Sequence, residues 1–128
     1  MQTMQQKRMK YALDKVESAA NAKKKVVKYQ KEYKSSASGF PAMIQMNGLG
    51  QAAAFYRSPD RGQEGTHQQL YNLLSGWLTQ SGQPYEKFDD LLKGITLCNM
   101  RTYLFAQAEA LELLNWVKKF AKAYMEDK

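Results

Sequence analysis

The sequence predicts an all-α fold, a single-domain helical bundle with about four major helices and one short helix. Apolar residues recur every three or four positions along most of the chain, the spacing that gives a helix one buried face. No segment shows the apolar–polar alternation of a half-buried strand. The 128 residues contain no internal repeat and suit one domain, so residues 1–128 are expected to form a single helical unit.

The first predicted element is a long basic helix over about residues 3–34. At 100° per residue its apolar positions fall near one line, and most lysines fall opposite, where Asp14 and Glu17 interrupt them. The apolar line consists of Met9, Leu13, Val16, Ala20 and Val27. Thirty residues of helix span about 45 Å. This length exceeds what so small a domain needs, so we expect one end to project or to pack on a partner.

A segment of small residues, from Ser35 to Gly39, predicts a linker after this helix. Pro41 should then occupy the first position of a second helix, where its missing N–H leaves no helical bond unmade. This helix is expected to run to about Tyr56. Its glycines, Gly48 and Gly50, indicate that another helix approaches closely.

The polar segment 57–66 is expected to be a mobile loop. Thr66 and Gln69 then match a capping box, in which each side chain bonds a free backbone N–H at the start of a helix. The third predicted helix therefore begins there and runs to about Gln80.

Two further helices complete the predicted bundle. After a turn at residues 81–84, a short helix should run from about Tyr85 to Lys93 and end at Gly94 in a left-handed cap. The last helix is predicted from about Leu97 to Met125. The residues expected in the common core are Leu13, Val16, Ile44, Phe55, Leu74, Trp77, Leu104, Leu111 and Leu114.

The formal net charge is +7, and the excess is confined to the first predicted helix. Residues 1–34 hold ten Lys/Arg and three Asp/Glu, a net of +7, whereas residues 35–96 and 97–128 carry −1 and +1. Basic charge confined to one element is typical of a face that binds a polyanion. The alternative is a lysine-rich helix surface that is merely solvated.

The candidate nucleic-acid-binding residues are the lysines of that helix that avoid the apolar line. They are Lys24, Lys25, Lys28, Lys7, Lys10 and Lys31. Tyr29 and Tyr33 lie beside them and could stack on bases, although packing into the core is the simpler use of both.

The residues that could support catalysis or bind a metal are sparse. His67 is the only histidine and Cys98 the only cysteine, so a zinc site of histidines and cysteines within one chain is excluded. We expect His67 to be solvated or to cap a helix, and Cys98 to be a small buried residue. Glu109 and Glu112 should lie on a solvated face. No catalytic residue, metal or cofactor is therefore predicted.

One glycine-rich string matches the spacing of a dinucleotide-binding fingerprint. It begins at Gly48 and continues through Gly50 to Ala53. The match is weak because that fingerprint needs a preceding strand and free N–H groups at a helix start. If the second helix starts at Pro41, these N–H groups are already bonded.

No run approaches the ~18 apolar residues that a membrane span needs. Lys7, Arg8 and Lys10 are not followed by the apolar stretch of a secretory signal. A lone cysteine gives no sign of an oxidising compartment. The cytoplasm is therefore the expected location.

Three segments in order along the chain resemble a known family. They are residues 10–16 (KYALDKV), residues 40–56 (FPAMIQMNGLGQAAAFY) and residues 109–123 (EALELLNWVKKFAKA). The chain is similar in them to the small all-helical subunit of the type III-B CRISPR effector, the Cmr or RAMP-module complex. The central segment is the most specific, because its string of residues is an unusual one to place in a helix.

The resemblance implies a non-catalytic subunit of an RNA-guided antiviral complex. In that family several copies stack beside larger subunits that hold the guide RNA, and they line the channel for the target strand. The expected partners are larger Cmr-type subunits, copies of this chain, and guide and target RNA, with no membrane and no small-molecule substrate. The resemblance supplies no residue-level binding motif, so the choice of lysines depends on the helical wheel alone.

The aromatic and basic end of the last helix is the predicted partner interface. Its candidate residues are Trp116, Lys119 and Tyr124. Two other interpretations of the sequence stay open. One is a free-standing basic helical regulator that binds nucleic acid outside any complex, and the other is a helical enzyme or adaptor that binds none.

Overall fold

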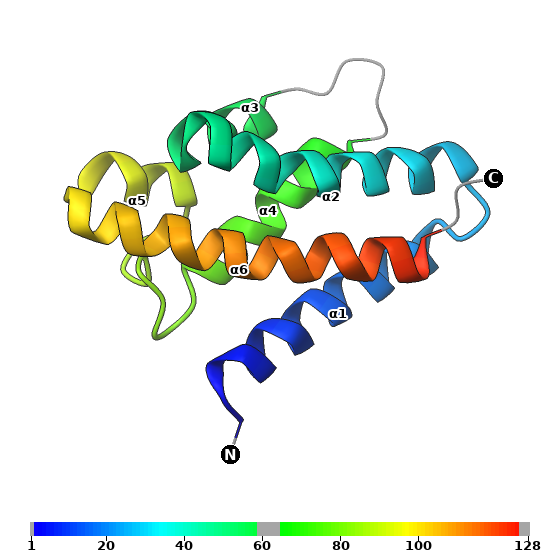
Figure 1. The fold of residues 1–128 in the computed structure, drawn as a ribbon, viewed down its shortest axis with the longest axis horizontal. Helices are drawn as coiled ribbons and strands as arrows, with labels where there is room; N and C mark the ends of the chain where they lie inside the picture. The colour runs from blue at the N-terminus through cyan, green and yellow to red at the C-terminus, as the bar shows by residue number, and fades with distance from the viewer. Residues whose placement is uncertain (1, 59–64, 126–128) are drawn as a thin grey trace.

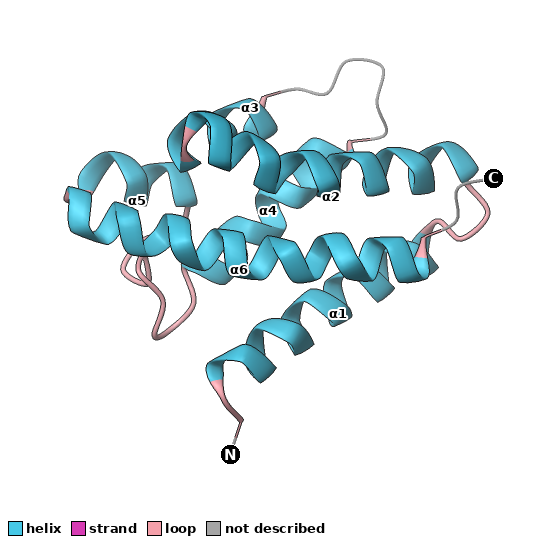
Figure 2. Cartoon of the chain, viewed as in Figure 1, coloured by secondary structure: helices cyan, strands magenta, loops and turns pink. Residues whose placement is uncertain are grey.

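The computed structural model describes residues 2–58 and 65–125, and these form six helices and no strand (Figure 2). The helices are α1 (Met4–Ala22), α2 (Val27–Asn47), α3 (Leu49–Arg57), α4 (Thr66–Leu78), α5 (Leu91–Leu97) and α6 (Met100–Tyr124). The all-α, single-domain prediction is confirmed, although the helices are more numerous than the four major and one short helix expected. Of the loop predicted at 57–66, residues 59–64 lie outside the described residues.

Helix α6 is the element on which the others assemble. It packs against α1 on one side and against α2, which runs antiparallel to it, on the other (Figure 1). Helices α3, α4 and α5 cover the remaining side of the bundle. The turn between α1 and α2 lies at the same end of the molecule as the C-terminal end of α6, and α5 lies at the opposite end.

The prediction of one helix over residues 3–34 is wrong, because the chain reverses at residues 23–26. The side-chain amide of Gln30, which is 1% exposed, donates from Nε2 to the carbonyls of Ala20 at 3.3 Å and Lys23 at 2.9 Å. Both carbonyls lie at the end of α1, where helical N–H partners run out, and the Lys23 carbonyl also accepts from the Val26 N–H at 3.1 Å. No glycine or proline marks the turn, so the sequence contains no local signal of it.

The predicted linker from Ser35 to Gly39 is also wrong, because these residues lie inside α2, as does Pro41. Tyr56 of α3 stacks on Phe40, with ring centroids 3.9 Å apart, and its hydroxyl donates to the Ser36 carbonyl at 2.7 Å. A side chain at Gly39 would lie 3.0 Å from that hydroxyl. The small residues therefore permit close helix packing rather than a break.

The second predicted helix is divided at Gly48, whose φ of 88° is unfavourable for other residues. The prediction of a capping box at Thr66 is wrong as well. Gly65 is the residue before α4, and the buried Thr66 hydroxyl lies 2.9 Å from that of Ser36 on α2. This hydroxyl pair joins two helices instead of capping one.

The turn at residues 81–84 is present, but the short helix predicted after it is displaced to Leu91–Leu97. Gly94 lies within this helix instead of ending it. It faces the fully buried ring of Tyr85, and a Cβ at Gly94 would lie 2.6 Å from the ring atom Cγ. The last helix begins at Met100, so Cys98 caps α5 and does not start α6.

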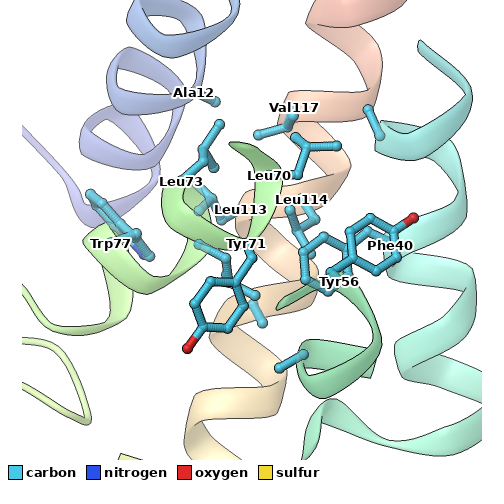
Figure 3. Packing of buried hydrophobic residues seen from close by; sticks show 14 of the residues in the cluster. Ala12, Phe40, Tyr56, Leu70, Tyr71, Leu73, Trp77, Leu113, Leu114 and Val117 are labelled. Carbon is cyan, nitrogen blue, oxygen red and sulfur yellow. The ribbon is translucent and has the colours of Figure 1, made fainter. Parts of the chain in front are cut away.

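The core lies between α6 and the helices around it (Figure 3). Of the predicted core residues, Trp77 is buried at 3% exposure, and Leu13 and Leu111 are partly buried. Four others are confirmed as buried. The four are Val16, Ile44, Leu74 and Leu114. The prediction is wrong for Phe55 and Leu104, which are 51% and 56% exposed. At 100° per residue, both lie well outside the buried faces of their helices, which are formed by residues such as Ala53 on α3 and Ala110 on α6.

A polar cluster joins α1, α4 and α6 beside this core. Arg8 donates from Nε and Nη2 to the two carboxylate oxygens of Glu109, the second at 2.9 Å. The Trp77 indole N–H also donates to Glu109, at 2.9 Å. The hydrogen bond from Arg8 to Glu109 raises the pKa of Arg8 above its ordinary value. Glu109 is therefore a structural residue, and the prediction that it is solvated is wrong.

Replacing Gly94 by alanine should destabilise the protein by about 1–3 kcal/mol, because the new methyl group overlaps the buried Tyr85 ring. Helix propensity alone gives the opposite sign, a gain of about 1 kcal/mol. Gly50→Ala is the control, since its Cβ would lie 3.5 Å from the nearest atom. Urea denaturation measures both, and equal stability of the two variants would contradict the packing described.

Glu109→Leu should lower the free energy of unfolding by roughly 3 kcal/mol, because it leaves Arg8 and the Trp77 N–H without their acceptor. Glu112→Leu on the same helix is the control. Its side chain is 62% exposed and lies 3.9 Å from Arg8, so its loss should cost less than about 1 kcal/mol. Thermal unfolding of both variants distinguishes the two carboxylates.

Candidate nucleic-acid interface

Exposed lysines are concentrated where α1 turns into α2. Lys24 and Lys25 lie in the turn itself, and Lys28 lies in the first turn of α2. These three make no ion pair with any described residue. Lys23 differs, because its ammonium lies 4.9 Å from the centroid of the Tyr29 ring. The turn therefore presents several unneutralised cations. Lys24 and Lys25 follow the C-terminal end of α1, where the helix dipole favours positive charge, whereas Lys28 lies at the N-terminal end of α2, where it does not.

The other predicted lysines do not form one face with these. Lys31 is exposed one turn further along α2, but Lys7 and Lys10 lie near the start of α1. Seventeen residues separate Lys7 from Lys24, which corresponds to roughly 25 Å along a helix. Lys10 is also paired with Asp14 at 3.0 Å. The structure thus divides the predicted site into the turn lysines, which are Lys24, Lys25 and Lys28, and a second pair at the far end of α1.

Tyr29 and Tyr33 pack inward. They are 2% and 0% exposed, and the Tyr29 hydroxyl donates to Gln69 on α4. Burial raises the pKa of both hydroxyls above the ordinary value for tyrosine. These rings consequently position the turn lysines and are not available to stack on bases.

The predicted partner residues occupy the C-terminal half of α6. The Trp116 ring is partly buried, with its centroid 5.6 Å from that of Phe120, and the Lys119 ammonium lies 5.1 Å from its centroid. Tyr124 is 48% exposed at the end of the helix. Trp116 is thus partly covered by its own helix neighbours, whereas the Tyr124 ring is more open.

A larger apolar surface lies at the opposite end of α6, and sequence reasoning missed it. It consists of Leu97, Met100, Leu104 and Phe105, which are 71%, 67%, 56% and 60% exposed. The helical spacing had placed Leu104 in the core, and that spacing cannot separate a buried stripe from an exposed one. Met100 and Leu104 are four residues apart on α6 and so share one face, and neighbouring exposed apolar side chains indicate a protein-binding surface. We call these four residues the apolar surface.

The two side chains best suited to react, His67 and Cys98, are both partly exposed. The His67 ring lies 4.3 Å from that of Tyr56 and 5.5 Å from that of Phe55, so it is packed rather than solvated. Cys98 is a free thiol of intermediate exposure. Across residues 2–58 and 65–125, no three His, Cys, Asp or Glu side chains are grouped to hold a metal ion.

The glycine string at Gly48 does precede a helix start, contrary to the expectation that its N–H groups lie within a helix. They are bonded nevertheless. Leu49 donates to the Gln107 side chain at 2.9 Å, and Gly50 donates to the Tyr103 hydroxyl at 2.8 Å. Two α6 side chains therefore occupy the position that a phosphate would need. Within the described part of the chain, no helix is both long and apolar enough to cross a membrane.

Comparisons with known proteins agree with the resemblance found in the sequence. Residues 4–124 match the model of a family described as CRISPR-associated protein (Cas_Cmr5). A Thermus thermophilus protein named CRISPR system Cmr subunit Cmr5 is 32% identical over 96 residues, which cover 75% of this chain and 77% of that protein. The crystal structure of a CRISPR-associated Cmr5 family protein from Thermus thermophilus superposes with a TM-score of 0.77 at 27% identity, covering 98% of this chain and 100% of that one. The chain therefore belongs to the Cmr5 family of CRISPR-associated proteins.

Proposed function

We propose that this protein is a non-catalytic small subunit of a type III-B CRISPR RNA-guided effector complex. Several copies stack along the complex and help to bind the target RNA strand in antiviral defence, in the cytoplasm. Its partners are larger Cmr-type subunits, further copies of this chain, and the guide and target RNA. Family membership and the three unneutralised turn lysines are the observations that support this proposal most directly.

The proposed RNA contact is electrostatic. Lys24, Lys25 and Lys28 are exposed, close in the chain and without acidic partners among the described residues. Three or four lysine–phosphate contacts give weak, sequence-independent binding, of the order of 10⁻⁴ to 10⁻⁶ M at physiological salt. Copies aligned on a scaffold would raise the effective concentration of each site and gain ~10²–10⁴ in avidity. Weak binding by one copy is therefore compatible with useful binding by the assembly.

The proposed stacking is supported by the two unlike ends of α6. The apolar surface lies at its N-terminal end, and Trp116, Lys119 and Tyr124 lie toward its C-terminal end (Figure 1). A contact between two different surfaces of one molecule repeats from copy to copy instead of closing after two. Such a head-to-tail contact produces a stack.

A non-catalytic role is supported by what the candidate acid–base groups contact. Glu109 is bonded by Arg8 and Trp77, and His67 is packed against Tyr56. Both side chains are thereby used in holding helices together.

Reversing the charge of the turn lysines tests the RNA contact. For single-stranded RNA, the parent protein should give a slope of log K against log salt of roughly −2 to −3, since three or four phosphates are contacted. The variant Lys24→Glu/Lys25→Glu/Lys28→Glu should flatten this slope in fluorescence anisotropy titrations. Lys87→Glu/Lys93→Glu/Arg101→Glu changes the net charge equally at other exposed positions and should leave most of the slope. If the first variant binds like the parent, the contact lies elsewhere.

Introducing charge on the apolar surface tests the stacking. Met100→Glu/Leu104→Glu should leave the isolated protein folded, because both side chains are exposed, but should reduce the number of copies in the reconstituted complex. Gln45→Glu/Gln51→Glu adds the same charge at exposed positions on α2 and α3 and serves as the control. Native mass spectrometry with larger Cmr-type subunits and guide RNA counts the copies. An undiminished copy number in the first variant would exclude this surface from the stack.

A further inference from the structure

Two surface hollows lie in the space between helices α1 and α4. The first has a volume of about 280 Å³ and is bounded by Lys7 and Lys10 of α1 and by Trp77 and Gln80 at the end of α4. The second, of about 290 Å³, is bounded by Lys15 of α1 and Asn72 of α4, among others. We call the two hollows together the α1–α4 groove.

A tyrosine bridge separates the two hollows. The Tyr11 hydroxyl donates to the Leu73 carbonyl at 2.7 Å, and the Tyr11 ring lies 5.0 Å from the Trp77 ring. A Cβ at Gly76 would lie 2.7 Å from the Tyr11 oxygen, so the missing side chain makes room for the bridge. Figure 3 shows Leu73 and Trp77 on the side of α4 that faces α1. On either side of this bridge the helices leave open space.

The groove connects the two lysine groups that the fold separates. Its first hollow contains Lys7 and Lys10, its second contains Lys15 and extends to Ala22, and the turn lysines follow directly in the chain. Asp14 at the rim of the first hollow pairs with Lys10. Lys7 and Lys15 make no ion pair with a described residue, and the Lys15 ammonium lies 5.5 Å from the centroid of the Tyr11 ring. A polyanion that ran from the first hollow through the second to the turn lysines would meet a lysine in each of these three places.

The groove also offers hydrogen-bonding groups that suit the edges of bases. Gln80 contributes a side-chain amide to the first hollow, and Asn72 contributes one to the second. Tyr33 lines the second hollow as well, but its hydroxyl is fully buried, so the two amides are the groups that can meet a base. Side-chain amides of this kind read the edges of unpaired bases in RNA.

We propose that the α1–α4 groove holds a segment of single-stranded RNA, with an unpaired base in each hollow and its phosphates on Lys7, Lys15 and the turn lysines. Pockets for drug-sized ligands run from about 300 to 1,000 Å³, so each hollow suits one base rather than a larger group. The proposal rests on the RNA-binding function proposed above. It adds that the protein contacts the bases as well as the backbone.

The test compares two strands of equal charge on the full-length protein. One is a twelve-nucleotide oligouridylate, and the other is an abasic ribose–phosphate strand of the same length. The parent protein should bind the first about tenfold more tightly in fluorescence anisotropy, because base contacts add to the phosphate contacts. Equal affinity for both strands would overturn the groove proposal but leave the RNA-binding function standing. Binding of neither strand would contradict the proposed function itself.

Two exposed substitutions locate the base contacts. Asn72→Leu/Gln80→Leu removes one amide from each hollow, and both positions are exposed, so the fold should persist. This variant should lose the tenfold preference for the base-bearing strand while its affinity for the abasic strand is unchanged. Gln45→Leu/Gln51→Leu removes two exposed amides from α2 and α3, outside the groove, and should keep the preference. A preference that survives in the groove variant places the bases elsewhere and overturns the proposal.

Discussion

The fold depends on one carboxylate at the centre of α6. Glu109 accepts hydrogen bonds from Arg8 of α1 and from Trp77 of α4, so a single side chain fixes two helices to the one on which the bundle assembles. The Tyr11 bridge then sets how closely α1 and α4 approach, and the α1–α4 groove is the space that remains. The turn lysines and the groove both depend on the position of α1, which this carboxylate holds.

The fold class and part of the apolar core were predictable from the sequence because both follow from local spacing. The helix boundaries were not, because in each case a distant contact outweighs local propensity. Gln30 closes a turn that has no glycine or proline, and Tyr56 packs on small residues that are typical of a linker. Gly94 is a residue type that often ends a helix, but here it lies within α5 and makes room for the ring of Tyr85, which lies outside that helix. Such contacts join residues far apart in the chain, and no short window contains both partners.

The candidate site was partly predictable for the same reason. The charge excess of the first 34 residues is a property of composition, and it indicates the turn lysines correctly as exposed cations. The separation of the turn lysines from Lys7 and Lys10 was not predictable, because it follows from the long-range packing of α1. The amides of Asn72 and Gln80 carry no signal in the sequence, since they acquire a possible role only when α1 lies across from them.

The turn closed by Gln30 has a consequence for how copies of this chain could exchange parts. Residues 3–34 have the spacing of one continuous helix, so the bent and straight forms of this segment differ mainly by the contacts that α1 makes after the reversal. In a straightened chain, α1 would leave its own α6 and could pack on the α6 of a neighbour through the same Arg8 and Glu109 contacts. A short hinge between identical binding partners is the arrangement from which domain-swapped dimers arise. The buried amide of Gln30 therefore favours the bent form, in which α1 packs on the α6 of its own chain, over exchange between molecules.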